Sequence, residues 1–323
     1  MSKSLGYITN KDLIYKVLLD PIRKGADKLI IISGYVSHNM ASWHMKKINE
    51  ESLPPIHISL IAGMYPIEGV SIELHEGLKS LVNFSEKHYS SFECKYIYQG
   101  PPVHSKVYLW MKQNVPLVAF TGSANYTKNG FGNTQREYIV SCDPFAALTF
   151  YQEIEADSIL CNHNEVEEYV KFYKDQKLTQ FKQETTHSSS EKVTLSLLTN
   201  RGDVGYGSGI NWGIRRDGTK REPNQAYISV PSNIARSGFF PLDKAHFSAI
   251  TDDHKQLILR IEQANDKALT TPLNNSLLGE YLRNRIGVAN GAFVTKADLE
   301  RYGRTDVTFY KIDDEQFFMD FSV

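Results

Sequence analysis

Two short segments of the chain carry side chains that could act together on a phosphodiester. His104-Ser105-Lys106 begins one apolar run, Gly122-Ser123-Ala124-Asn125 ends the next, and Glu137 follows after a loop. A histidine imidazole is a competent nucleophile near neutral pH when a carboxylate holds its tautomer. We therefore expect His104 to attack phosphorus and Glu137 to orient its imidazole.

The other polar residues of these segments suit the charge that develops on a phosphoryl group. Lys106 would place a fixed positive charge against the non-bridging oxygens, and Ser123 and Asn125 would donate hydrogen bonds to the same oxygens. The sequence around them has no cluster of aspartates with divalent-metal spacing. We therefore expect Lys106 and Asn125 to stabilise the charge without a metal ion.

Each of these residues also has an ordinary structural interpretation. A lone histidine in a strand is usually a surface residue or is hydrogen-bonded within the protein, and a Gly-Ser pair is usually a turn. A lone lysine is usually solvated. The order H-x-K, then G-S-x-N, then an acidic residue, each on a predicted strand or strand end, rarely arises by chance and favours the catalytic interpretation.

Strands are expected to position these groups. Alternation along an extended strand puts His104 and Lys106 on one face, and Pro101-Pro102 would start that strand. Ser123 and Asn125 share one side if the chain stays extended there. The three segments could then converge on one pocket.

Residues 1–175 alternate between strand-like apolar runs and helix-like segments, which predicts an α/β domain with a mixed sheet flanked by helices. The expected strands are Leu29–Val36, Ile56–Ala62, Phe92–Tyr98, Lys106–Met111, Val115–Thr121 and Tyr138–Cys142. The expected helices are residues 39–50, 71–88 and 145–174.

Residues 176–191 are polar and contain a serine triplet, so we interpret them as a linker. Beyond it, residues 192–323 predict a β-rich domain in the form of an open barrel. Its expected strands are Val193–Leu198, Ala226–Val230, Gln256–Ile261, Val307–Ile312 and Gln316–Phe321, with short helices near Ser276–Arg285 and Lys296–Tyr302.

The composition is that of an ordinary globular protein, with 41% hydrophobic and 23% charged residues, and 323 residues favour two domains. No apolar stretch approaches the roughly 18 residues of a membrane span, and the N-terminus does not resemble a secretory signal. We expect a cytoplasmic protein with no membrane partner. Cys94, Cys142 and Cys161 lack metal-ligand and redox spacing and are expected to be buried, reduced thiols.

The net charge of −1 does not indicate a nucleic-acid partner, but basic residues gather in one part of the second domain. The glycine-containing stretch 205–231 carries donors that suit base edges and phosphates: Asn211, Trp212, Arg215, Arg216, Arg221 and Asn224. A surface loop without a ligand would have a similar composition, and Trp212 also suits a packing anchor.

The order of the first-domain residues resembles the phospholipase D superfamily, whose signature is H-x-K-x4-D followed by G-S-x-N. His104, Lys106, Ser123 and Asn125 match it position by position, within a resemblance that covers residues about 1–155. Glu137 matches the acidic residue that typically follows in the family's nucleases.

One position departs from the family motif, because Met111 stands where the motif has aspartate. Several nuclease branches of the family also lack the aspartate, so the change points towards nucleases. The family normally needs two motif copies for one active site, and this chain has one. The resemblance therefore implies a homodimer through the N-terminal domain, in which one His104 forms a phosphohistidine and the other protonates the leaving oxygen. It also implies that no cofactor and no metal are needed.

The second domain resembles the C-terminal portion of the NgoFVII group of restriction endonucleases, in which a phospholipase D-like nuclease is joined to a B3-like DNA-recognition barrel. The resembling segments are S-G-x-N-W-G at 208–213, P-N-x-A-Y-I at 223–228, D-L-x-x-Y-G-R at 298–304 and V-T-F-Y-K-I at 307–312. B3-like domains grip the major groove with two arms. The resemblance implies a first arm at residues 206–224, and we place the second at 263–275, with Asn265, Lys267, Asn274 and Asn275.

These features together predict a type II-like restriction endonuclease that cleaves double-stranded DNA. A non-specific nuclease or a phospholipase D-type phosphodiesterase remains an alternative, since the same site could act on other diesters. A DNA-binding protein with a decayed nuclease domain is a third, supported by Met111. Some relatives act with an ATP-dependent partner, and because this chain has no G-x4-G-K-[ST] motif, any ATP use would come from a partner subunit.

Overall fold

The computed structural model describes residues 8–84, 87–132, 135–174, 191–217, 219 and 221–323. The chain forms two units, residues 1–175 and 176–323. The linker expected at 176–191 lies outside the described residues except for Glu191. Each unit has its own sheet, and each is described by itself.

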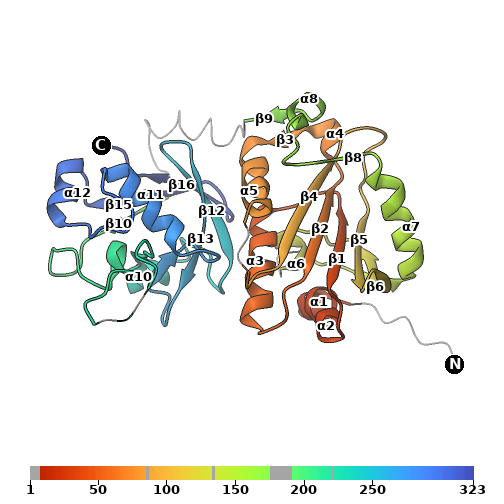
Figure 1. Ribbon diagram of the computed structural model, residues 1–323, viewed down its shortest axis with the longest axis horizontal. Coiled ribbons are helices and arrows are strands. Elements are labelled where there is room, and N and C mark those ends of the chain that lie inside the picture. The colour runs from red at the N-terminus through yellow and green to blue at the C-terminus, as the bar shows by residue number, and fades with distance from the viewer. Residues whose placement is uncertain (1–7, 85–86, 133–134, 175–190, 218, 220) are drawn as a thin grey trace. The chain divides into compact units, whose positions relative to one another are not determined.

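A seven-stranded mixed sheet runs through the N-terminal unit in the order β7-β6-β5-β1-β2-β4-β8 (Figure 1). Its strands are β1 Lys28–Ser33, β2 His57–Ala62, β4 Ser91–Ile97, β5 Lys106–Lys112, β6 Val115–Gly122, β7 Ile139–Cys142 and β8 Ser158–Leu160. Strands β1, β2 and β4 pair in parallel, and the other neighbours pair antiparallel.

Helices cover both faces of this sheet, with α3 and α5 on one side and α7 on the other (Figure 1). The helical elements of the unit are α1 Asn10–Leu13, the π-helix η1 Ile14–Leu19, α2 Asp20–Arg23, α3 His38–Glu50, α4 Tyr65–Glu68, α5 Ile72–Val82, α6 Lys128–Phe131, α7 Pro144–Glu155 and α8 Val166–Tyr169. A small second sheet pairs β3 Val70–Ser71 with β9 Phe172–Tyr173. This arrangement confirms the predicted α/β class.

The six predicted strands are confirmed to within a few residues at their ends, but the helix predicted at residues 145–174 is wrong in its second half. Helix α7 ends at Glu155, and the chain then forms β8, α8 and β9. Strand β8 pairs antiparallel with β4 at the edge of the main sheet. The hydrogen bonds between β8 and β4 favour a strand here, although the local spacing of apolar residues favours a helix.

His44, in helix α3, is buried, and its two ring nitrogens have different partners. His44 Nε2 lies 3.2 Å from the Leu18 carbonyl, and its Nδ1 lies 2.9 Å from the Tyr126 hydroxyl. A carbonyl can only accept, so Nε2 carries the proton and Nδ1 accepts from Tyr126. Burial lowers the pKa of His44 to about 4, and burial also lowers the pKa of His38 to about 4.

Acid is therefore expected to destabilise the N-terminal unit already at pH values above those at which carboxylates titrate. Between the ordinary histidine pKa of 6.5 and the folded value of about 4, the unfolded chain binds protons that the folded chain does not. Stability is complete above about pH 6.5 and falls as the pH drops towards 4, by at most about 3 kcal/mol for each histidine. Urea unfolding at pH 7 and pH 4.5 measures this loss, which we expect to be about 2 kcal/mol smaller in His44→Gln. The exposed His88→Gln is the matched control, and an unchanged pH dependence in His44→Gln would contradict the assignment.

The C-terminal unit is built on a second seven-stranded sheet, in the order β10-β15-β16-β12-β13-β14-β11 (Figure 1). Its strands are β10 Lys192–Ser196, β11 Ile228–Ser229, β12 His246–Thr251, β13 Gln256–Glu262, β14 Ala268–Thr270, β15 Asp306–Lys311 and β16 Gln316–Asp320. Only β12 and β16 pair in parallel. The edge strands β10 and β11 also approach each other, so the sheet forms a nearly closed barrel, which confirms the predicted β-rich domain.

The described residues of this unit also form four helical segments: the 3₁₀ turn η2 Gly209–Asn211, α10 Ser232–Ala235, α11 Ser276–Ile286 and α12 Lys296–Tyr302. Strand β12, the middle strand of the sheet order, was not expected from the sequence. All six of its residues are buried, including His246, Ser248 and Thr251. Polar residues at these positions hide the strand, because they interrupt the apolar run that usually marks a buried strand.

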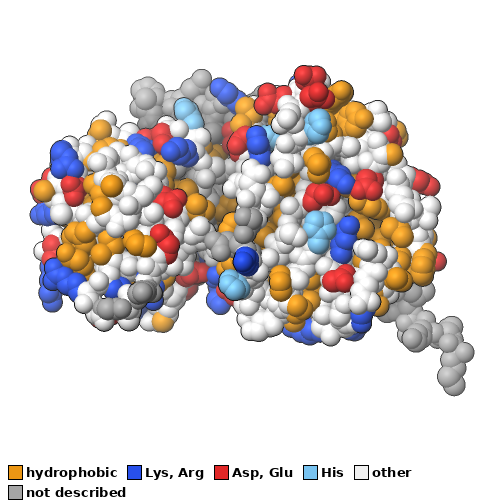
Figure 2. Space-filling model, viewed as in Figure 1, with side chains coloured by type: hydrophobic (Ala, Val, Ile, Leu, Met, Phe, Trp, Pro, Cys, Tyr) orange, Lys and Arg blue, Asp and Glu red, His pale blue; other side chains and the backbone are white. Residues whose placement is uncertain are grey.

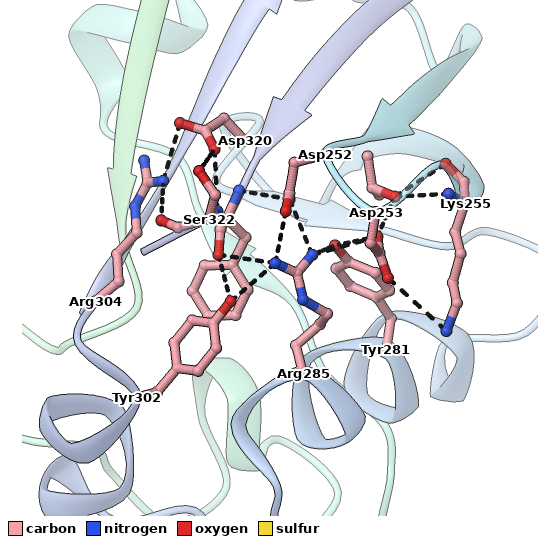
Figure 3. Close-up of polar contacts among 11 residues, drawn as sticks. Asp252, Asp253, Lys255, Tyr281, Arg285, Tyr302, Arg304, Asp320 and Ser322 are labelled. Carbon is pink, nitrogen blue, oxygen red and sulfur yellow. Dashed lines mark hydrogen bonds and ion pairs between the residues drawn. The ribbon is translucent and has the colours of Figure 1, made fainter.

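One arginine ties the end of the chain to the barrel (Figure 3). Arg285, in α11, donates to both carboxylate oxygens of Asp252, at 2.9 and 2.6 Å, and to the carbonyl of Phe321 at 3.1 Å. The hydroxyls of Tyr281 and Tyr302 lie 2.6 and 2.9 Å from the same guanidinium. The hydrogen bond to Asp252 is the main reason why the pKa of Arg285 lies above its ordinary value.

Candidate active site and nucleic-acid interface

His104 and Lys106 meet at the start of β5. Lys106 is the first residue of the strand, and His104 lies in the loop two residues before it rather than on the strand itself. The Lys106 Nζ is 3.2 Å from Nε2 of His104 and donates to the His104 carbonyl at 2.6 Å. The two side chains therefore lie on the same side, as predicted.

The charge of Lys106 constrains the protonation of its neighbour. An ammonium has donors only, so Nε2 of His104 accepts from Lys106 and the ring proton sits on Nδ1. Burial lowers the pKa of Lys106, and the negative charge of Glu137 opposes that shift. His104 itself is exposed, and its Nε2 lone pair is occupied by the hydrogen bond from Lys106.

Ser123 and Glu137 are held together where β6 ends and β7 begins. The Ser123 hydroxyl donates to the Glu137 carboxylate and accepts from the Tyr138 N–H at 3.0 Å. The Ser123 N–H donates to the Tyr138 carbonyl at 2.9 Å. Gly122 allows this approach, because a Cβ there would lie 2.0 Å from the Tyr138 carbonyl oxygen.

These contacts bear on two roles that the sequence suggested. Among the described residues, His104 has polar contacts with Lys106, while the Ser123 hydroxyl is a donor to Glu137. In this structure Ser123 directs its proton to the Glu137 carboxylate and supports it. That Glu137 orients the imidazole and that Ser123 donates to a phosphoryl oxygen stay predictions.

Asn125 is oriented by backbone and side-chain donors from the loop after β1. Its Oδ1 accepts from the Tyr35 N–H at 3.1 Å and shares the Ser33 hydroxyl proton, at 3.4 Å, with the Tyr35 carbonyl, which lies 2.6 Å from that hydroxyl. Because the carbonyl end is fixed by these donors, the amide Nδ2 is left to donate elsewhere. The Ser33 hydroxyl also accepts from the Tyr126 N–H at 2.9 Å, which secures the same turn.

Met111, at the position of the motif's aspartate, is an apolar core residue. It is 5% exposed and belongs to the apolar cluster that includes Val107, Leu109 and residues of α7. Alternation along β5 puts it on the face opposite Lys106. The position therefore contributes packing and has no contact with the candidate site.

Two residues next to His104 were not expected from the sequence. The edge of the Tyr35 ring faces the imidazole, with ring centroids 6.1 Å apart, and Tyr35 donates its hydroxyl to Glu68 at 2.7 Å. Gly34 allows the imidazole to lie close, since a Cβ there would be 3.1 Å from its Cδ2. The polar ending of the β1 run was the available signal, because parallel strands place functional loops at their carboxyl ends.

Two of the six residues expected to contact DNA in the first arm lie in the interior of the C-terminal unit. Asn211 is fully buried, donates to the Val294 carbonyl at 2.8 Å and accepts from the Val294 N–H at 2.9 Å. Asn224 is 7% exposed and accepts from the Gly291 N–H at 2.7 Å. Both amides are used within the protein, so these two predictions are corrected: they are structural residues.

The arginines of the same segment lie at the surface. Arg216 and Arg221 are exposed, and Arg215 is half-buried, 3.9 Å from Asp217 in a long ion pair. Trp212 is half-buried with its ring edge against Tyr227, and the Arg221 guanidinium lies 4.6 Å from the centre of the Trp212 ring. Residues 218 and 220 of the predicted arm lie outside the described residues.

The four residues of the predicted second arm belong to two different elements. Asn265 and Lys267 are exposed in the turn between β13 and β14. Asn274 and Asn275 lie at the start of α11, where the Asn274 side chain accepts from the Ser276 N–H at 3.0 Å. The backbone carbonyl of Asn275 accepts from the Ala226 N–H at 3.1 Å. Their role in DNA contact stays a prediction, with the 274–275 pair in a position that supports the helix start.

Within the described ranges, no group of three or more His, Cys, Asp or Glu side chains is arranged to hold a metal ion. None of the helices in that part of the chain has the length and apolar character needed to cross a bilayer. The thiols of Cys94 and Cys161 are fully buried, and Cys142 is half-buried.

Two family models match the chain in order. The NgoFVII restriction endonuclease N-terminal PLD domain matches residues 11–168, and the NgoFVII C-terminal B3-like DNA-binding domain matches residues 185–313. No curated protein matches the chain.

Three solved structures are similar to about half of the chain. NucT from Helicobacter pylori is 14% identical with a TM-score of 0.34, covering 48% of this chain and 99% of that one. Nuc from Salmonella typhimurium, a phospholipase D family member, is 13% identical with a TM-score of 0.34, covering 49% and 97%. Polyphosphate kinase from Porphyromonas gingivalis is 12% identical with a TM-score of 0.30, covering 55% and 28%.

The two matched domains together account for the sheet that carries His104 and Lys106 and for the barrel that carries the exposed arginines. The protein therefore belongs to the NgoFVII restriction endonucleases, in which a phospholipase D-like nuclease domain that acts on phosphodiester bonds is followed by a B3-like DNA-binding domain.

Proposed function

We propose that this nuclease is a type II-like restriction enzyme that hydrolyses DNA through a phosphohistidine intermediate, without a metal ion, in an active site shared by two chains. The contact between His104 Nε2 and Lys106 Nζ, at 3.2 Å, carries the proposal. It supports a neutral imidazole whose Nε2 lone pair is released for attack when the phosphoryl oxygens take over the Lys106 donors, and it places a cation beside those oxygens.

The proposed reaction has two displacements at phosphorus. Nε2 of His104 attacks, forming a P–N bond and breaking a P–O bond, and His104 of the partner subunit protonates the leaving oxygen. That second imidazole, now neutral, takes a proton from water as the water oxygen attacks phosphorus. The P–N bond breaks, and both histidines return to their starting states.

Lys106 and Asn125 would stabilise the charge on the non-bridging oxygens in both displacements. The Lys106 ammonium is fixed by the His104 carbonyl, and the Asn125 amide is fixed by the Tyr35 N–H and the Ser33 hydroxyl. Donors that are already oriented need little reorganisation as the charge develops, which is the main source of such stabilisation. Glu137, held by Ser123, faces the site as the acidic member of the set.

The single motif copy supports a dimer. Among the described residues of this chain, no second histidine contacts His104, so the acid in the first displacement is proposed to come from another copy. Co-expression of wild-type and His104→Ala chains tests this. A shared site predicts that mixed dimers are inactive, whereas activity proportional to the wild-type fraction would show that each chain works alone.

The amide of Asn125 gives an isosteric test of the donor set. Asn125→Asp keeps the oxygen that accepts from Tyr35 and Ser33 but replaces the donor with negative charge. We expect the single-turnover cleavage rate to fall about 100- to 1,000-fold, with little change in thermal stability. The exposed Asn129→Asp introduces the same charge nearby and is expected to have a much smaller effect. Equal effects of the two variants would show that only general repulsion of DNA is at work.

Digestion of a plasmid of known sequence in EDTA, followed by mapping of the ends, tests the proposed function as a whole. Defined fragments with shared sequence at their ends are expected. Acid-quenched reactions with labelled DNA should contain a covalent DNA–protein adduct that is lost in His104→Ala. Cleavage that needs an added divalent metal would overturn the metal-independent mechanism.

Other outcomes of the same digestion correspond to the other functions that the site permits. Ends without a common sequence would indicate a non-specific nuclease. Headgroup release from phospholipid vesicles without DNA cleavage would indicate a lipid phosphodiesterase. DNA binding without any adduct or cleavage would indicate a decayed nuclease, unless adding ATP and a partner subunit restores cutting.

A further inference from the structure

Two aromatic rings and an arginine form a continuous stack on the surface of the C-terminal unit. The Tyr206 and Phe293 rings are stacked, with centroids 4.0 Å apart and an angle of 22° between their planes. The guanidinium of Arg216 lies 3.7 Å from the centre of the Tyr206 ring. Tyr206 is 42% exposed, so the stack lies at the surface.

A second arginine of the same loop is supported in a related way. The Arg221 guanidinium lies 4.6 Å from the centre of the Trp212 ring, and the edge of Trp212 packs against Tyr227. Stacking occupies the face of a guanidinium and leaves its N–H groups, which lie in the plane, able to donate. Both arginines are therefore supported without their donors being used.

The loop that carries these arginines is fixed to a second loop far away in the sequence. Besides the Asn211–Val294 and Asn224–Gly291 hydrogen bonds, the fully buried Arg283 donates to the Ala292 carbonyl at 2.9 Å and to Asn211 Oδ1 at 3.4 Å. Residues 291–294 therefore belong structurally to the same surface as the segment 206–224. The second contact segment expected from the sequence, residues 263–275, is a different part of the chain.

The charge around the two guanidinium groups is not neutralised within the described part of the chain. There, neither Arg216 nor Arg221 forms an ion pair, and the neighbouring Asp217 carboxylate accepts from the Thr219 N–H and hydroxyl. Figure 2 shows Lys and Arg side chains beside apolar ones at the lower left of this unit. Exposed guanidinium groups on aromatic supports keep in-plane N–H donors that water satisfies and that a ligand can take over.

We propose that Arg216 and Arg221 are the guanine-reading residues of this enzyme, with Tyr206, Phe293 and Trp212 as the residues that position them. An arginine fork is the best bidentate partner for O6 and N7 of guanine in the major groove. Holding the fork in advance lowers the entropy lost on binding, so the rings contribute to specificity without touching DNA themselves. The inference rests on the proposed sequence-specific function and names the bases that it reads.

Selection from a randomised duplex library tests the inference independently of cleavage. The full chain in a His104→Ala background is used, so that bound DNA is not cut. We expect the enriched sequences to contain guanines, and Arg216→Ala to lower the preference for one guanine position on the order of tenfold. Tyr206→Ala should weaken the same position, whereas Tyr206→Phe, which keeps the stack, should not. Arg201→Ala removes an exposed arginine outside the stack and should leave every base preference intact.

The possible outcomes separate this inference from the proposed function. Enriched sequences that lack guanine, or that are unchanged in Arg216→Ala and Arg221→Ala, would overturn the inference and leave the nuclease proposal standing. No enriched sequence at all would overturn both. Loss of the preference in Tyr206→Phe as well as in Tyr206→Ala would overturn the positioning role of the ring, because the stack alone would not explain the effect. Thermal melting confirms that each variant is folded.

Discussion

Replacement of His104 by alanine is expected to abolish DNA cleavage and to leave DNA binding and folding intact. The imidazole is exposed, and its polar contacts within the described chain are to Lys106, so its removal creates no buried cavity. Because the proposed route passes through a P–N bond, loss of the nucleophile should lower the single-turnover rate by at least about a thousandfold. Rates measured at saturating enzyme, beside a gel-shift titration, separate cleavage from binding.

His88→Ala provides the matched control, since it removes another exposed histidine of the same unit. It should cut at the wild-type rate. Retention of cleavage by His104→Ala would place the nucleophile elsewhere and remove the catalytic assignment. A parallel loss of DNA binding in His104→Ala would instead indicate that the imidazole serves mainly to hold the substrate.

Replacement of Arg285 by methionine is expected to cause the largest loss of stability in the C-terminal unit. The guanidinium and the Asp252 carboxylate are 15% and 16% exposed, and removing the arginine leaves a mostly buried carboxylate unpaired (Figure 3). Breaking such a pair from one side costs about 3 kcal/mol or more, chiefly through the charge that remains. Asp253 would be affected too: burial opposes its ionisation, but the Thr251 hydrogen bond and the Arg285 charge outweigh this and keep its pKa below the ordinary value.

Urea unfolding of the full chain at neutral pH measures this effect. The control is Arg301→Ala, which breaks an ion pair with Asp298 at a side chain that is 63% exposed and should change stability by less than about 1 kcal/mol. Adding Asp252→Asn to Arg285→Met should recover part of the loss, because it removes the unpaired charge and retains the oxygen that accepts from the Phe321 N–H. A double variant no more stable than Arg285→Met would show that packing, and not the remaining charge, dominates.

Strands could be predicted from the sequence where the local pattern of apolar residues matches the burial of the strand in the fold. Strands β1 and β2 are buried over most of their length, so their sequences are nearly continuous apolar runs. The turn between β5 and β6 is a tight hairpin in which Gln113 and Asn114 adopt positive φ angles of 49° and 64°. Strand β12 was not readable, because its polar residues are buried by neighbouring strands that only the fold brings together.

In the candidate site, too, some contacts follow from local sequence and others depend on the fold. The proximity of His104 to Lys106 follows from their spacing of two residues, and the orientation of Asn125 does not, because it depends on Ser33 and Tyr35 from another strand end. Likewise, Asn211 and Asn224 have side chains that suit base edges, yet the fold uses both amides to fasten one loop to another. Residue type alone cannot distinguish an outward donor from one that satisfies a buried backbone group.

The sequence by itself determined the chemistry and the order of the domains, because H-x-K, G-S-x-N and the later acidic residue are local patterns whose side chains have few other joint uses. The tertiary structure alone decided which groups meet: it gave Glu137 to Ser123, put Met111 in the core, and stacked Arg216 on Tyr206 and Phe293. These pairings depend on contacts between segments far apart in the chain. Their energies come from burial and geometry, which the order of residues does not reveal.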